Sequence, residues 1–320
     1  MVVTSFQSQL KVVYHPCPGL DPNECLEALS QLLTTPYTAF LGDDDFLCTQ
    51  ALTRCIDFLE SHPAYGAAHG EGLILQVEGG TPYGAIGSVG FYPQPRIESE
   101  SGSTRLIEYL TRTPALLLTS VHRTSIWKAM FHGVTLRREA KLHAGSGYRG
   151  ELSASCIAVI RGKVKEVEGL SLVRQTHDRH YHWNHIFDRL TSPNWWTDLQ
   201  FFQGRLIEEL TQQDGLNTQQ AQLVVRQGLW AYFAKDVIDA WQLERRDGHT
   251  AASVRRRQWV TSLRQWAKRI SVVKVSYDRC RRVVQRYVNP YSLPALLRPS
   301  SPHYANFLPI YKVISESIPR

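Results

Sequence analysis

The feature that most constrains the fold is a short apolar stretch that ends in three adjacent carboxylates. Residues 37–41 are apolar and partly aromatic, as expected of an interior strand of a parallel sheet. Gly42 permits a turn, and Asp43, Asp44 and Asp45 follow it. Open α/β sheets place their ligands at the carboxyl ends of their strands. The stretch therefore predicts a parallel-sheet strand that carries acidic side chains to a ligand-binding edge.

Three neighbouring carboxylates repel one another unless a positive group lies among them. A divalent cation is one solution, and hard oxygen ligands select Mg²⁺ or Mn²⁺. Magnesium uses one or two carboxylates and completes its coordination shell with water and substrate phosphates. The alternative is a solvated acidic turn that caps the following helix, because aspartate is common in turns and caps.

The surrounding chain alternates predicted strands and helices. We expect further strands at residues 10–16, 64–76, 115–121 and 163–174, and helices at residues 26–33, 51–59, 103–110, 126–131 and from 151 onward. Asp21 or Asn23 is expected to cap the helix at residues 26–33. Residues 79–102 are rich in Gly, Pro and Ser and predict a long loop.

The motif T-P-Y-x-x-x-L-x-D-D-D-F-L at residues 35–47 is followed by a predicted helix and by His62-Pro63-Ala64-Tyr65. This order resembles the glycosyltransferase family 2-like enzymes of the GT-A fold. Later landmarks of the resemblance are His122-Arg123-Thr124, Glu151-Leu152, Gly162-Lys163 and Val173-Arg174, so it spans residues 10–177. It implies an α/β fold with a mostly parallel, GT-A-like sheet flanked by helices.

The resemblance also implies an activity, the metal-dependent and inverting transfer of a sugar from a nucleotide-sugar donor to a hydroxyl acceptor. The acceptor would be a glycan, a lipid or a small molecule. Asp43 and Asp45 would form the D-x-D motif that holds Mn²⁺ or Mg²⁺ against the donor diphosphate. Asp44 would contact the ribose of the donor or cap the next helix.

Three other side chains are candidates for the site. The resemblance implies that Glu151 is the catalytic base; the alternative is a first-turn acid stabilised by the helix dipole. Arg123 follows a predicted strand and is expected to face the donor phosphates, or else to form a salt bridge within the fold. His177 would be a further metal ligand, or part of a histidine-rich linker with His180, His182 and His185.

The family's domain opens with a strand-helix-strand unit that holds the nucleotide base and ribose. Only about ten residues precede the first strand expected here, so we expect that unit to be missing and the base pocket to be incomplete. The alternative function is therefore an inactive relative that binds a partner or a membrane surface.

The sequence has no apolar run of about 18 residues and no signal peptide, and its six cysteines form no C-x-x-C pair. These features predict a cytoplasmic protein with reduced thiols, peripheral at most to the inner face of the membrane. We expect a glycosyltransferase domain at residues 1–185 and a helical region at residues 186–320.

The net charge of +7 comes from one segment of the helical region. Residues 255–286 hold eleven Lys or Arg against a single acid, Asp278. A solvated helix face packed on the catalytic domain is the favoured explanation, an anionic membrane surface is second, and nucleic acid is third.

Overall fold

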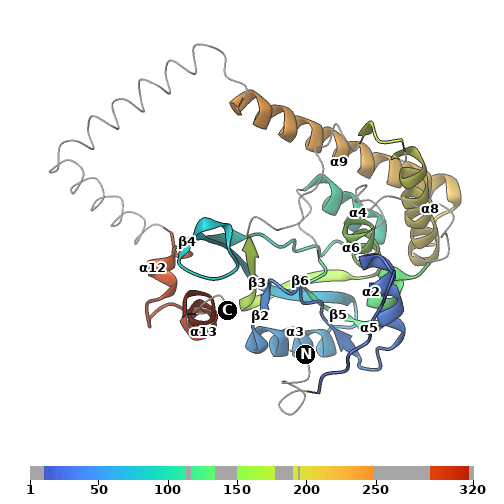
Figure 1. The fold of residues 1–320 in the computed structure, drawn as a ribbon. Helices are drawn as coiled ribbons and strands as arrows, with labels where there is room; N and C mark the ends of the chain where they lie inside the picture. Colours follow the sequence, from blue (N-terminus) through green and yellow to red (C-terminus); the bar gives the residue numbers. More distant parts are fainter. Residues whose placement is uncertain are drawn as a thin grey trace.

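The computed structural model describes residues 11–112, 117–133, 150–176, 190–193, 195–247 and 289–316. These residues form a mixed α/β fold in which helices lie on both faces of one sheet (Figure 1). The strands are β1 (Tyr37–Thr38), β2 (Phe46–Leu47), β3 (Tyr65–Val77), β4 (Ile86–Tyr92), β5 (Val121–Arg123) and β6 (Lys163–Thr176). Their order in the sheet is β1-β5-β3-β6-β2, and β4 pairs with β3 off this path.

The sheet is mixed, so the expectation of a mostly parallel sheet is wrong for the described residues. Only β3 and β6 run parallel, while β1–β5, β5–β3, β3–β4 and β2–β6 are antiparallel. The long β3–β6 pair is the centre of the sheet, and its backbones approach closely at Gly70. A Cβ atom at Gly70 would lie 2.1 Å from the carbonyl oxygen of Gly169, which explains the need for glycine there.

Helix α3 (Thr49–Ser61) covers one face of the sheet, and α4 (Gly102–Thr111), α5 (Thr124–Phe131) and α6 (Glu151–Arg161) lie on the other side (Figure 1). Helix α2 (Pro22–Gln31) packs against α5. Its start confirms the predicted cap. The Asp21 carboxylate accepts hydrogen bonds from the backbone N–H groups of Asn23 and Glu24, and the Glu24 side chain accepts one from the backbone of Asp21.

The helices that follow pack on this core. Helices α8 (Trp195–Asp214) and α9 (Thr218–Asp247) lie outside α4 and α6, and bury Phe202, Leu206 and Leu229 in the same apolar cluster (Figure 1). The Asp214 carboxylate caps α4, because it accepts hydrogen bonds from the backbone N–H groups of Gly102 (2.9 Å) and Ser103 (2.7 Å). Helices α12 (Leu293–Leu296) and α13 (Tyr304–Glu316) pack beside β4.

Four predicted elements differ in the structure. The strand expected at residues 37–41 is only the two-residue β1, which pairs antiparallel with β5, and Leu41 is exposed. Residues 11–16, the described part of the strand expected at 10–16, form no regular element. The loop expected at residues 79–102 contains the 3₁₀ turn η1 (Glu78–Gly80) at its start and the whole of β4.

A fourth element, the strand expected at residues 115–121, begins only at Val121, after a turn.

No helix of the described ranges is both long enough and apolar enough to cross a membrane. The five cysteines in those ranges are free thiols, as predicted.

Candidate functional site

The three aspartates lie in a turn between β1 and β2, and the turn orients them differently. The backbone N–H of Asp45 approaches the carbonyl oxygen of Gly42 at 3.4 Å. Asp43 is exposed, Asp44 is half-buried, and the Asp45 side chain is only 6% exposed. The carboxylates therefore do not form one solvated patch, because Asp45 points into the protein and Asp43 points out of it.

The antiparallel pairing of β2 with β6 holds Asp45 in place. Phe46 and Val173 are partners across these strands, so the residues that flank them, Asp45 and Arg174, come together. One oxygen of Asp45 lies 3.6 Å from Nε of Arg174, and the other accepts a long hydrogen bond (3.3 Å) from the backbone N–H of Gln175. The pairing register thus fixes the orientation of this carboxylate.

Arg174 connects Asp45 to two further groups. Its guanidinium donates a hydrogen bond to the phenol oxygen of Tyr92 (3.0 Å) and lies 5.2 Å from the centre of the Tyr92 ring. Burial lowers the pKa of Arg174, but its neighbours outweigh burial and raise that pKa above its ordinary value. Tyr92 is the largest of these influences, Asp45 is next, and Glu151 also contributes.

Glu151 is the first residue of α6, as predicted, and follows Gly150 at the N-cap. It is half-buried in the first turn, where the helix dipole stabilises a carboxylate. Glu151 is the smallest of the influences that raise the pKa of Arg174, whereas Asp45 is in direct contact with that guanidinium. Sequence reasoning named both carboxylates without predicting a role for the arginine.

The described residues offer few metal ligands, and the carboxylates of Asp43 and Asp45 point in different directions. Within the described part of the chain, no group of three or more His, Cys, Asp and Glu side chains is placed to hold a metal ion. The turn offers the exposed carboxylate of Asp43 and the oriented one of Asp45. Two carboxylates fit the habit of Mg²⁺, which takes its other ligands from water and phosphate.

Arg123, which was expected to face the donor phosphates, makes structural contacts instead. Its guanidinium donates to the carbonyl oxygens of Tyr65 (2.9 Å), Leu59 and His62 (3.3 Å). Leu59 and His62 lie at the carboxyl end of α3, where a cation complements the helix dipole. We therefore assign Arg123 to the packing of α3 against β5; it bonds backbone carbonyl oxygens, whereas its alternative in the sequence was a salt bridge within the fold.

His122, the other half of the His-Arg pair, is fully buried. One ring nitrogen lies 2.7 Å from the carbonyl oxygen of Leu117, and the ring packs on Trp127 with centroids 5.5 Å apart. Burial lowers the pKa of His122 to about 4, and the nearby His69 contributes in the same direction. This histidine is therefore neutral at pH 7 and belongs to the core.

Two predicted features fall outside the described residues. They are His177 with the histidine cluster up to residue 185, and the basic segment at residues 255–286. Their proposed roles as metal ligand and as contact surface stay predictions.

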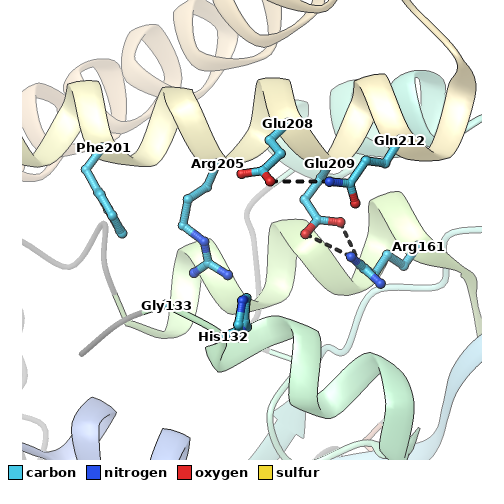
Figure 2. Close-up of a pocket in the computed structure, with 8 residues that line it drawn as sticks. All are labelled: His132, Gly133, Arg161, Phe201, Arg205, Glu208, Glu209 and Gln212. Atoms are coloured by element: carbon cyan, nitrogen blue, oxygen red, sulfur yellow. Dashed lines mark hydrogen bonds and ion pairs between the residues drawn. The ribbon is translucent and has the colours of Figure 1, made fainter. Parts of the chain in front are cut away.

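A pocket of about 490 Å³ lies where α5 ends against α6 and α8, and none of the predicted site residues lines it (Figure 2). Arg161 of its wall forms a two-pronged ion pair with Glu209, at 2.6 and 3.1 Å. Arg205 points across the pocket in Figure 2 and donates to the carbonyl oxygen of Ala129 (3.0 Å), near the end of α5. Burial lowers the pKa of Arg205 despite the nearby glutamates. These contacts join helices, so we treat the pocket as a structural junction.

Sequence reasoning did not assign roles to Tyr92 and Arg174. Arg174 was recognised only as a landmark of the resemblance, and Tyr92 lay in a stretch expected to be a loop. The signals that could have found them are the β-branched and aromatic residues among the glycines of 86–92 and the cation at the end of an apolar run in β6.

Comparison with known proteins adds no assignment, since no protein-family model matches the chain and no curated protein is significantly similar to it.

Proposed function

We propose that the protein transfers a sugar from a nucleotide-sugar donor to a hydroxyl acceptor, with the Asp43–Asp45 turn and Glu151 as its site. The observation that carries this proposal is that Asp45 of the acidic turn lies against Arg174, a cation at the end of β6 whose side chain stays partly exposed. An acidic turn and a partly exposed arginine thus lie together. This pairing suits a ligand that carries negative charge.

Each group has a role in the proposed reaction. Asp43 and Asp45 would hold Mn²⁺ or Mg²⁺, which when bound would offset the negative charge of the donor diphosphate. Arg174, whose side chain is 25% exposed, keeps Asp45 oriented and presents a positive charge to the same phosphates. Glu151 would take the proton of the acceptor hydroxyl. A GT-A-like arrangement of the nucleotide pocket is part of this proposal.

Nucleotide binding tests the first half of the proposal. We expect the full chain to bind a nucleoside diphosphate more tightly with Mn²⁺ than without it, and Asp43→Asn to weaken the metal-dependent binding about tenfold or more. The matched control is Asp57→Asn, an exposed aspartate on the neighbouring helix α3. Isothermal titration calorimetry measures both. Binding that ignores Mn²⁺, or equal losses in the two variants, would overturn the metal site.

Turnover tests the second half. Glu151→Gln should lose sugar transfer while keeping its affinity for the nucleoside diphosphate, because a base acts only on the acceptor proton. Glu60→Gln, an exposed position on α3, serves as the control for the general effect of removing a carboxylate. Full activity in Glu151→Gln, measured with a panel of nucleotide sugars, would exclude Glu151 as the base.

A further inference from the structure

Helix α9 carries apolar side chains on two opposite faces. Its inner face, with Val225 and Leu229, is buried on the core, and a Cβ atom at Gly228 would lie 2.9 Å from the side chain of Leu110 in α4. Ala234 comes nine positions after Val225, which is about two and a half helical turns, so it lies on the opposite side, where it is exposed. A helix that packs on one side only is normally polar on the other.

The exposed side chains of this opposite side follow a seven-residue repeat. They stand alternately four and three positions apart, and we call them the α9 outer face: Leu223, Gln227, Trp230, Ala234, Val237 and Trp241. Five of the six are apolar. Alternation of four and three is the spacing of the seam along which two helices pair in a coiled coil. The seam is about 27 Å long, since a helix rises about 1.5 Å per residue.

Trp196 of α8 widens this surface. Its neighbour Trp195 packs on Phe233 of α9 with ring centroids 6.2 Å apart, so Trp196 lies near the middle of the outer face. Trp196, Trp230 and Trp241 are 59%, 68% and 56% exposed, which leaves roughly 450 Å² of tryptophan surface in solvent. With the aliphatic side chains between them, the surface approaches the ~800 Å² that each partner buries in a standard protein interface.

The charges of α9 do not favour a strongly charged partner. Between residues 218 and 242 the structure describes equal numbers of cations and acids, namely Arg226, Lys235, Asp236 and Asp239. The acids come eleven and fourteen positions after Val225, close to three and four full turns, so they lie on the side of α9 away from the outer face. Lys235 pairs with Asp239 at 2.6 Å. Within this range, Arg226 is therefore the one charge that borders the outer face.

The outer face is complementary to itself when two copies run antiparallel. Trp230 of one copy then lies opposite Ala234 of the other, so a large side chain meets a small one, and the contact occurs twice around the two-fold axis. The antiparallel pair also keeps the two Arg226 side chains about 18 Å apart along the axis, whereas a parallel pair would set them side by side. The same register aligns the remaining positions, Leu223 with Trp241 and Gln227 with Val237.

We propose that the α9 outer face binds the same face of a second copy of the chain, with the two helices antiparallel. The inner faces stay on their own cores, on opposite sides of the helix pair, so association needs no change in either core. The modest area implies a dissociation constant of about 10 μM. This inference is independent of the proposed sugar transfer, since the two sites share no residue.

Sedimentation velocity of the full chain between about 1 and about 200 μM tests this proposal. We expect the average mass to rise with concentration from that of one copy toward that of two. Ala234→Glu places a carboxylate against Trp230 of the second copy and should weaken association about tenfold or more. The matched control is Gln222→Glu, which adds the same charge at an exposed position of α9 outside the outer face and should associate as the wild type does.

A mixing experiment tests the antiparallel register. Trp230→Lys alone should also weaken association, because its ammonium group would face Ala234 of the second copy. A mixture of Ala234→Glu and Trp230→Lys should associate more tightly than either variant alone. The mixed pair keeps one Trp230–Ala234 contact and brings the introduced ammonium against the introduced carboxylate. A mixture that associates no better than its components would contradict this register.

Three other results would overturn the proposal. The first is a wild type that stays a single copy at about 200 μM, and the second is equal association of Ala234→Glu and Gln222→Glu. The third is binding of the single copy to phosphatidylcholine vesicles that Ala234→Glu loses, since the face would then contact a membrane. The concentration series on the wild type needs no variant, so the first result decides the matter even if circular dichroism shows that Ala234→Glu is misfolded.

Discussion

Replacing His122 should change the pH dependence of stability. Burial lowers the pKa of His122 from 6.5 to about 4, because the charged ring would lose its hydration in the core. In the unfolded chain the same ring takes up a proton near its ordinary pKa. Between these two pKa values the unfolded state binds more protons than the folded state, so the free energy of unfolding rises with pH.

The size of the effect follows from the shift. Lowering the pKa of His122 from 6.5 to about 4 corresponds to about 3 kcal/mol in the free energy of unfolding. This contribution is fully present above pH 6.5 and is lost as the pH falls toward 4. His122→Gln removes the titrating ring, so its unfolding free energy should fall less steeply across this window than that of the wild type. Urea unfolding at several pH values, followed by circular dichroism, measures the difference in slope.

A destabilised control separates this effect from general weakening. Val121→Ala empties part of the same buried strand without removing a titratable group, so it should lower stability at every pH and keep the wild-type slope. Carboxylates titrate in this range as well, but they do so equally in all three proteins. If His122→Gln and the wild type show parallel curves between pH 6.5 and 4, the reasoning about His122 is wrong.

Three further substitutions test local features of the fold by thermal or urea unfolding. Gly70→Ala would place a Cβ atom 2.1 Å from the carbonyl oxygen of Gly169 and should cost about 2–4 kcal/mol, whereas Gly90→Ala meets only an ordinary contact and should cost far less. Asp21→Ala removes the α2 capping box and should cost about 1 kcal/mol. Asp214→Ala removes two hydrogen bonds to the start of α4 and should cost about 1–2 kcal/mol; an unchanged midpoint in either cap variant would contradict its assignment.

The helices were predictable because their signals are local. The cap of α2 is complete within residues 21–24, and the apolar spacing of α3 lies within one helix. Strand β4 was missed although its pairing partner is near in the sequence. It pairs antiparallel with β3 across residues 78–85, but its Gly- and Ser-rich composition gives a weak strand signal.

The strand expected before the aspartates failed for a different reason. The apolar residues 37–41 suggested a buried parallel strand, but only Tyr37 and Thr38 pair with β5, and Leu41 is 52% exposed. Apolar composition indicates what can be buried, while pairing partners decide what is buried. The site depends in the same way on the β2–β6 register, which local sequence does not encode.

The β2–β6 register gives Asp45 and Asp43 different roles. Asp45 stabilises the fold, whereas Asp43 is the aspartate whose loss tests the metal site. Asp45 is almost buried and bound to β6 through Arg174 and Gln175, so Asp45→Asn should lower the unfolding free energy by about 1–3 kcal/mol, whether or not a metal binds. Asp43 is exposed, so Asp43→Asn should stay within about 0.5 kcal/mol of the wild type. If only Asp45→Asn loses nucleotide binding, the loss is explained by the damaged strand pairing. A loss of nucleotide binding in Asp43→Asn, with its stability unchanged, is the result that indicates a metal site. If Asp43→Asn is itself strongly destabilised, as measured by urea unfolding, the turn is a structural element and its acidic composition serves the fold.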